Sequence, residues 1–275
     1  MPELAEVEFY RKRWHPGLGR RVVVVRAHPS ARVFRTSPAR RIQCALAGST
    51  LLSSAAAAKQ LLFRFSGGRW LGIHLGMSGE LRTAPPDYAP QKHDHLVLVQ
   101  RERCLVFTDP RMFGRVRFAL GRHPPGWWTN LPPPILSTAF TVGAVAAFLQ
   151  RRRRSPIKAV LLLQQRFPGV GNWMADEILW RAAIHPRRPA GSLGPAEVRT
   201  LWRECRVVCR LALAANAGRG DDPPPALNVR IPDSWLFHHR WDDGGRCPRT
   251  GAPLQRAVIA GRTTCWSPAR QKLRP

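Results

Sequence analysis

The hydrophobic pattern of the chain changes near its middle, and this change constrains the fold more than any other feature. Segments rich in β-branched and aromatic residues, which are typical of strands, recur at 21–26, 61–65, 70–74, 96–100, 104–108 and 116–119. A Pro- and Trp-rich stretch follows at 123–134, and from Thr141 onward apolar residues recur at helical spacing. Strands followed by helices predict an α+β protein with more than one domain.

Each part of this pattern predicts a separate domain. Residues 3–14 form an expected amphipathic helix with Leu4, Val7, Tyr10 and Trp14 on one side. The strand-like segments after it predict a β-sandwich, so that the first domain covers 1–125 and includes a hairpin turn at 66–68. A linker at 126–140 leads to a helical domain at 141–235, with helices expected at 142–150, 157–165, 172–183 and 193–215. Short strands with turns are expected in the last domain, 236–275.

The charge balance predicts a polyanionic partner. The chain carries 44 Lys and Arg against 17 Asp and Glu, for a net charge of +27. Phosphates of nucleic acid favour such a surface through counterion release, and a membrane surface is the rival polyanion. No apolar run approaches the roughly 20 residues of a spanning helix. The six cysteines are scattered, and no secretion signal precedes them, so a reduced intracellular protein is expected.

The chain begins Met1-Pro2-Glu3. Removal of Met1 would leave Pro2 with a free secondary amine, and an α-amino group has a pKa of about 7.7–8. Such an amine is partly unprotonated near neutral pH and can attack an electrophilic carbon to form an iminium. Glu3 and Glu6 place carboxylates beside it. Pro at the second position is also common without any catalytic meaning, so a catalytic role for Pro2 depends on what the rest of the chain contains.

Three further segments carry possible chemistry. Pro168-Gly169-Val170-Gly171-Asn172 precedes a helix and is either a phosphate-binding helix N-terminus or an ordinary helix connection. The segments 74–79 and 109–114 present Met77, and Arg111 with Phe113. Apolar side chains with an Arg are what proteins insert into a base stack, although such residues are more often part of a core.

Together these segments resemble one family, the bacterial formamidopyrimidine-DNA glycosylases with their endonuclease VIII relatives. The resemblance covers essentially the whole chain in order: PELAEVE at the start, an isolated Lys59 before a hairpin, HLGMSG at 74–79, KHDH at 92–95, FTDPRMFG at 107–114, GVGN at 169–172, IHP at 184–186 and GRTT at 261–264. It implies a helix-two-turns-helix fold for the helical domain and a finger-like β-hairpin at the end.

The resemblance also implies a role for each matching residue. Pro2 would attack C1′ of the damaged nucleotide and form a Schiff base, with Glu3 as general acid or base. Other positions support these two, bind phosphate or fill the gap left by the flipped nucleotide. Glu6 and Glu177 would support the active site, and Lys59 would bind phosphate and assist catalysis. The gap-filling residues would be Met77, Arg111 and Phe113. Phosphate would be bound by His74, His93, Lys158 and Asn172, and by Arg262, the catalytic arginine of the finger.

The last domain departs from the family pattern, which usually has two Cys-x-x-Cys pairs that bind zinc. The first pair reads Cys247-Pro248-Arg249-Thr250 and the second aligns with Ser267-Pro268-Ala269-Arg270. We therefore expect a zincless finger without metal or other cofactor, packed on Leu254, Val258, Ile259 and Trp266. A hybrid site of Cys247, Cys265 and His238 or His239 is the alternative.

The function expected from the resemblance is that of a bifunctional DNA glycosylase and abasic-site lyase of base excision repair. It would act as a monomer on damaged duplex DNA in the bacterial cytoplasm, at the nucleoid, and cut the strand by β- then δ-elimination. Met77, Arg111 and Phe113 favour 8-oxoguanine and formamidopyrimidines. The lesion-capping loop, at 217–234, departs strongly from the family with its run Asp221-Asp222-Pro223-Pro224-Pro225 and leaves oxidised pyrimidines open. A non-catalytic nucleic-acid-binding relative is the alternative.

Overall fold

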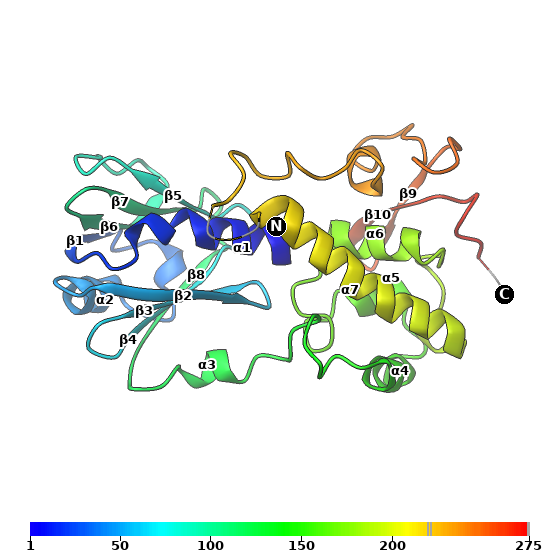
Figure 1. The fold of residues 1–275 in the computed structure, drawn as a ribbon, viewed down its shortest axis with the longest axis horizontal. Helices are drawn as coiled ribbons and strands as arrows, with labels where there is room; N and C mark the ends of the chain where they lie inside the picture. Colours follow the sequence, from blue (N-terminus) through cyan, green and yellow to red (C-terminus); the bar gives the residue numbers. More distant parts are fainter. Residues whose placement is uncertain (219, 221, 274–275) are drawn as a thin grey trace. The chain divides into compact units, whose positions relative to one another are not determined.

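The computed structural model describes residues 1–218, 220 and 222–273 (Figure 1). Arg219 and Asp221, which belong to the expected lesion loop, lie outside the described residues. The chain divides into two compact units, Met1–Leu131 with Ala217–Pro224, and Pro132–Asn216 with Pro225–Pro275. The first unit is built on strands and the second mainly on helices, as the change in hydrophobic pattern predicted.

The first unit is a sandwich of two antiparallel four-stranded sheets. One sheet has the order β1-β6-β7-β5 (Val22–Ala27, Asp94–Gln100, Cys104–Thr108, Glu80–Ala84), and the other has the order β2-β3-β4-β8 (Leu51–Ala57, Gln60–Phe65, Arg69–His74, Arg115–Leu120). Helix α1 (Leu4–Arg13) contacts β5 and β2, an edge strand of each sheet. The start of the chain is therefore held at the open edge of the sandwich (Figure 1).

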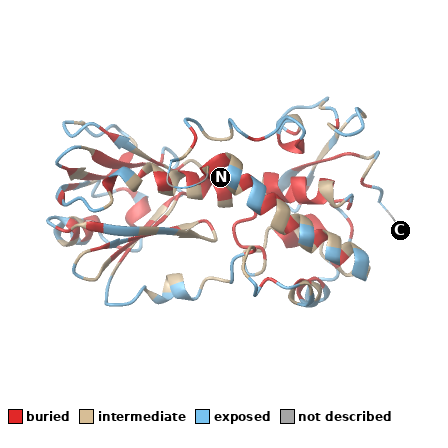
Figure 2. Ribbon diagram, in the orientation of Figure 1, coloured by how far each residue is buried: buried red, intermediate tan, exposed pale blue. Residues whose placement is uncertain are grey.

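Helix α1 is buried on more than one side, which the amphipathic pattern did not predict. Val7 and Trp14 of the predicted stripe are 1% exposed, and Phe9, which lies off that stripe, is 3% exposed. The charged residues Glu6 and Lys12 are also buried. Much of α1 is accordingly red in Figure 2. A buried charge requires polar partners, so α1 is held by polar interactions as well as by apolar packing.

Other elements of the first unit were missed from the sequence. Strand β2 is rich in Ala and Ser, residues without a strong strand preference, and it forms a sheet edge through its pairing with β3. Helix α2 (Ala39–Leu46) and strand β5 were also unpredicted, whereas the hairpin turn expected at 66–68 joins β3 to β4. Helix α3 (Gly126–Thr129) lies within the expected linker, and short 3-10 helices lie at His15–Gly17 and Arg32–Phe34.

The second unit contains helices α4 (Val142–Arg151), α5 (Ile157–Leu161), α6 (Asn172–Arg181) and α7 (Pro195–Ala217), with 3-10 helices at Ala190–Ser192 and Leu236–His239. The hairpin β9–β10 (Gln255–Ile259, Arg262–Trp266) follows. Helix α5 is shorter than predicted because the side chain of Gln164 forms hydrogen bonds with backbone groups of the segment that follows it. It donates to the carbonyls of Leu162 and Val170 and accepts from the N–H of Gly169.

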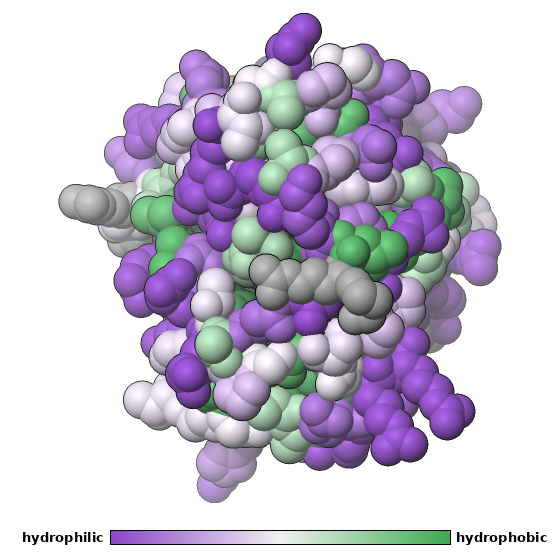
Figure 3. Space-filling model, turned by 90° about the vertical axis from the view of Figure 1, so that its right-hand side faces the viewer, coloured by the Kyte–Doolittle hydropathy of each residue, from purple (hydrophilic) through white to green (hydrophobic). Residues whose placement is uncertain are grey.

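The surface is strongly hydrophilic. The face shown in Figure 3 carries mostly hydrophilic residues with separate small hydrophobic patches. The run of arginines at 151–154 is fully on the exterior, so its charges are available to a solvent-borne partner. Within the described part of the chain, no helix is both long and apolar enough to cross a membrane.

Candidate active site and nucleic-acid interface

The start of the chain is ordered by a helix cap. Glu3 is the N-cap residue of α1, and the side chain of Glu6 accepts a hydrogen bond from the backbone N–H of Glu3. Glu3 and Glu6 are 2% and 7% exposed, while Pro2 is only partly covered. This arrangement uses Glu6 to fix the backbone that carries Pro2 and Glu3, which is a positioning role.

Tyr10 and Glu80 lie close to Glu6, although the sequence singled out neither as functional. Burial, together with the negative charges of Glu80 and Glu6, raises the pKa of Tyr10 to about 12. Tyr10 also has a side-chain hydrogen bond with Glu80. The N-terminal segment therefore sits beside an acidic cluster whose phenol stays protonated at every physiological pH.

Lys59 occupies the tip of the β2–β3 hairpin, as the sequence predicted. The two turn residues, Ala58 and Lys59, have φ of 47° and 65°. A two-residue hairpin of this type needs positive φ at both positions and is normally made by Asn and Gly. Non-glycine residues there cost about 1–3 kcal/mol each. Strain of this size at a lysine, itself only 6% exposed, marks the turn as a candidate functional position.

His74, at the end of β4, lies in the field of several cations. Burial, together with the positive charges of Lys59, Arg115, Arg117 and Arg35, lowers the pKa of His74 to about 4. The N–H of Gly76 donates to His74 Nδ1 at 3.0 Å. The imidazole is therefore neutral at pH 7, and its Nε2–H can donate a hydrogen bond to a phosphate oxygen.

Asp109 joins the two loops that carry the predicted gap-filling residues. It is fully buried, and its carboxylate accepts hydrogen bonds from Ser78 Oγ at 2.7 Å and from Gly114 N at 2.6 Å. Gly76 allows the loops to approach, because a Cβ there would lie 2.4 Å from the nitrogen of Gly114. The buried carboxylate thus fixes the loop of Met77 against the turn of Arg111.

The three residues predicted to fill the gap are exposed, so none of them is a core residue. Met77 is 37% and Phe113 is 45% exposed. The guanidinium of Arg111 stacks over the ring of Phe113, 4.9 Å from its centroid. Exposed apolar side chains with a stacked guanidinium on a rigid support can insert into a base stack. His93, which the sequence predicted to bind phosphate, is partly buried, and its carbonyl accepts from the N–H of Asp109.

In the second unit, Lys158 is completely buried. Its ammonium donates to the carbonyl of Asn172 at 2.6 Å and pairs with the carboxylate of Asp176, which also pairs with Arg240. The structure therefore uses Lys158 to hold the first turns of α6, and its predicted phosphate contact stays a prediction. Asn172 is partly exposed in the first turn of α6, and its Nδ2 donates to the carbonyl of Thr263 at 2.8 Å.

Glu177 is buried on α6, and burial raises its pKa although Arg181 opposes this effect. The side chain of Arg181 pairs with it at 2.7 Å, and the N–H of Phe237 donates to it at 3.3 Å. Glu177 therefore links α6 to the segment that precedes the finger. Arg262 lies exposed directly after the hairpin tip, where Ala260 and Gly261 have φ of 50° and 73°.

The residues at the positions of the family's zinc ligands do not fit zinc. Thr250, Ser267 and Arg270 stand where cysteines would be needed, and an Arg cannot ligate a cation. Burial favours the neutral thiol of Cys247, but hydrogen bonds from Thr250, Ser267 and Trp180 outweigh it and lower its pKa to about 6. The indole N–H of Trp180 donates to the sulfur at 3.4 Å.

The alternative hybrid metal site is not assembled either. Among the described residues, no three His, Cys, Asp or Glu side chains are grouped so that they could hold a metal ion. The imidazoles of His238 and His239 contact the carbonyls of Ile231 and Asp233. The finger packs on Trp180, Leu236, Cys247 and Cys265. Of the predicted core residues, Ile259 and Trp266 are buried and Leu254 partly so.

Val258 was wrongly predicted as a core residue of the finger. It is 67% exposed and pairs with Thr263 across the hairpin. Because side chains alternate between the faces of a strand, burial of Ile259 turns Val258 outward.

Comparison with known proteins identifies relatives along the whole chain. The family model described as the formamidopyrimidine-DNA glycosylase N-terminal domain matches residues 1–116, and the model of the H2TH domain of the same enzyme matches residues 131–221. The formamidopyrimidine-DNA glycosylase of Roseiflexus sp. is 37% identical over 276 residues, covering 99% of this chain and 100% of the relative. That of Thermus thermophilus is 36% identical, covering 98% of each chain.

Solved structures of the Lactococcus lactis Fpg protein are also similar. Its complex with DNA containing an oxidized pyrimidine has a TM-score of 0.86 at 25% identity, covering 99% of this chain and 100% of that one. Its complex with DNA containing an abasic site has a TM-score of 0.86 at 25% identity, covering 98% and 100%. The likeness therefore extends over both units and the finger.

Proposed function

The chain belongs to the formamidopyrimidine-DNA glycosylase family, whose members are DNA glycosylases of base excision repair, and from this premise we propose that the reaction runs through the amine of Pro2. The observation that carries this proposal is the ordered start of the chain, where Glu6 caps the backbone at Glu3 and holds Pro2 partly exposed. A secondary amine beside a buried carboxylate provides a nucleophile and a proton-transfer group.

The proposed steps balance without an oxidant or reductant. The lone pair of the Pro2 nitrogen forms a bond to C1′, the bond from C1′ to the base breaks, and the leaving base takes up a proton. The C1′–O4′ bond then breaks and the proton of the Pro2 nitrogen passes to O4′, so that the sugar opens to an iminium. The iminium withdraws electrons and makes the C2′ proton acidic. Loss of that proton expels the 3′ phosphate, and a second elimination expels the 5′ phosphate. Glu3 would transfer protons at the sugar, with Glu6 and Glu177 as supporting residues.

The DNA would be held by cations and by neutral donors. We assign phosphate contacts to Lys59, at the tip of the β2–β3 hairpin, to Arg262, directly after the tip of the β9–β10 hairpin, and to His74, His93 and Asn172. Lys158 would act on the same turn as Asn172, since its ammonium binds the carbonyl of that residue. Met77, Arg111 and Phe113 would fill the gap left by the flipped nucleotide, with Arg111 facing the orphaned base.

The proposed substrates are duplex DNA with oxidised purines or formamidopyrimidines and DNA with abasic sites. This assignment is supported by the exposed Met77, Arg111 and Phe113 and by relatives named for formamidopyrimidine. The Lactococcus lactis protein, which has been solved with an oxidized pyrimidine, keeps pyrimidine lesions within the substrate range to be tested. We place the protein as a monomer at the nucleoid in the bacterial cytoplasm, in keeping with its bacterial relatives.

The test is reductive trapping. Incubation of the protein with an abasic-site duplex and borohydride should give a covalent protein–DNA adduct. Pro2→Leu, whose bulky second residue retains Met1 and shifts the amine by about 3.8 Å, should give none, whereas the surface variant Lys272→Met should trap normally. Absence of any adduct on abasic and 8-oxoguanine duplexes, with duplex binding retained, would support the non-catalytic binder instead.

A further inference from the structure

Lys12, near the end of α1, has an environment that the proposed chemistry does not require. It is 5% exposed. Its ammonium donates hydrogen bonds to the carbonyl oxygens of Ala217 at 2.7 Å, of Gly218 at 3.3 Å, and of Gly220. An ammonium has three protons to donate, so these three carbonyls use its full capacity.

The loop that supplies these carbonyls starts at a helix C-terminus and has a backbone that favours glycine. Ala217 is the last residue of α7, where carbonyls lack helical partners and the helix dipole is negative. Gly218 and Gly220 have φ of 69° and 72°, and a Cβ on Gly218 would lie 2.7 Å from the carbonyl oxygen of Asp222. Carbonyl oxygens turned toward one point repel each other, and the cation of Lys12 removes that repulsion.

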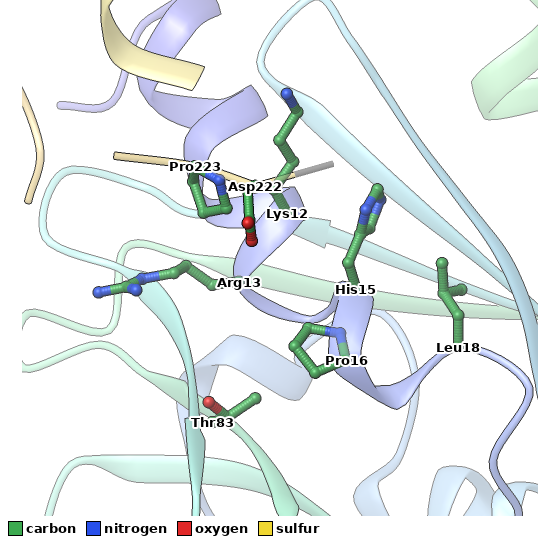
Figure 4. A pocket seen from close by; sticks show the side chains of 8 residues that line it. All are labelled: Lys12, Arg13, His15, Pro16, Leu18, Thr83, Asp222 and Pro223. Carbon is green, nitrogen blue, oxygen red and sulfur yellow. The ribbon is translucent and has the colours of Figure 1, made fainter. Parts of the chain in front are cut away.

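The surroundings leave the loop room to move once this tie is cut. A hollow of about 430 Å³ lies between the loop and the end of α1. Figure 4 shows it lined by Lys12 and Arg13 of α1, by Thr83 of β5, and by Asp222 and Pro223 of the loop. Beside this hollow, the hydrogen bonds of the Lys12 ammonium tie Ala217, Gly218 and Gly220 to α1.

We propose that Lys12 is a positioning residue that sets the start of the lesion loop, at Ala217, Gly218 and Gly220, and thereby governs recognition of the damaged base. This inference rests on the proposed function, because it takes the loop after α7 as the part that meets the base. Lys12 belongs to the helix that Glu3 caps, so one rigid element would fix both the nucleophile and the loop. An abasic site has no base to recognise, and its cleavage should not depend on Lys12.

The experiment compares excision of 8-oxoguanine with cleavage of an abasic site. Lys12→Met keeps the length of the side chain and removes its donors; we expect base excision to fall roughly tenfold or more, the size produced by unpaired buried polar groups, with abasic cleavage within about twofold. Lys12→Arg should recover much of the loss because it keeps the charge and N–H donors. Lys272→Met controls for the lost charge.

Two results would overturn the proposal. Base excision that is unchanged in Lys12→Met would show that the tie is irrelevant, and a parallel loss of both activities in a folded variant would show a scaffold role only. Trapping of the wild-type protein on abasic DNA reports the proposed function separately. Hydrogen exchange of the DNA-free protein adds a readout without catalysis: the amides of Gly218, Gly220 and Asp222 must exchange faster in Lys12→Met.

Discussion

The N-terminal segment with Pro2 and Glu3 and the finger with Arg262 differ in how closely they follow the family pattern. The first departs only at Ala5, where Pro is usual, whereas the second retains Cys247 alone among the zinc-ligand positions. Both are nevertheless well formed, one through a cap by Glu6 and the other through packing around Trp180 and Cys247.

On the proposed mechanism, this difference separates residues that would take part in the reaction from residues that only support the fold. A secondary amine and an adjacent carboxylate have no substitutes among the other side chains at the N-terminus. A metal that only holds a hairpin can be replaced by hydrogen bonds and aromatic packing. In the finger, Arg249 and Arg270 flank the ring of Trp180 at 4.7 and 5.4 Å, while its N–H reaches the sulfur of Cys247.

The largest expected effect falls on the N-terminal segment. Glu3→Gln keeps the shape of the buried side chain and removes its capacity for proton transfer, so base excision should fall by roughly 10²–10⁴-fold. Single-turnover excision of 8-oxoguanine measures this effect, and duplex affinity serves as the control. A variant that excised at the wild-type rate would place the acid–base group elsewhere.

A smaller effect is expected in the finger. Cys247→Ala removes the acceptor of the Trp180 N–H and should lower the free energy of unfolding by about 1–3 kcal/mol. Because the folded pKa of Cys247 is lowered to about 6, its stabilisation should be fully present above the unfolded pKa and be lost as the pH falls through 6. Thermal unfolding of the wild type between pH 5.5 and 9 measures this loss, and it should vanish in Cys247→Ala.

The same experiment tests the absence of zinc from the finger. A chelator should leave the melting temperature and duplex affinity of the wild type unchanged. Stoichiometric zinc in the purified protein, with a melting temperature that falls on chelation, would contradict this prediction. It would also remove the contrast between the N-terminal segment and the finger.

The smallest effect concerns His74, which the structure keeps neutral. Its folded pKa of about 4 lies below the unfolded value of about 6.5, so only the unfolded chain takes up its proton between these values. The free energy of unfolding should therefore decrease as the pH falls from 6.5 to 4. His74→Gln should flatten this part of the profile. An unchanged slope in the variant would assign the proton uptake to other groups.

Sequence patterns predicted the parts of the fold that rest on local preference. The β-branched and aromatic segments became β1, β3, β4, β6, β7 and β8, and the glycines at 67 and 68 formed the expected turn. Strand β2 was not predicted because Ala and Ser show no strand preference. It forms a strand through its pairing with β3. The early end of α5 depends on hydrogen bonds of the Gln164 side chain, which cannot be predicted from the spacing of apolar residues.

The site was predictable where a motif lay in one short segment. Pro2, Lys59, Met77 and Arg262 could be identified by position. The structure adds the positive φ of Lys59 and the exposure of Met77 and Arg262. Lys12 gave no signal, because its acceptors lie about 200 residues later in the chain. A positive φ at a non-glycine residue and the burial of a lysine are properties of the fold, which the sequence does not display.

The central claim is that the N-terminal proline is the nucleophile, and mass analysis of the trapped adduct tests it most directly. After trapping on an abasic-site duplex, nuclease and protease digestion should yield a sugar-modified peptide that begins at Pro2, with Met1 absent. A modification found on Lys59, or on a peptide that still carries Met1, would contradict the account.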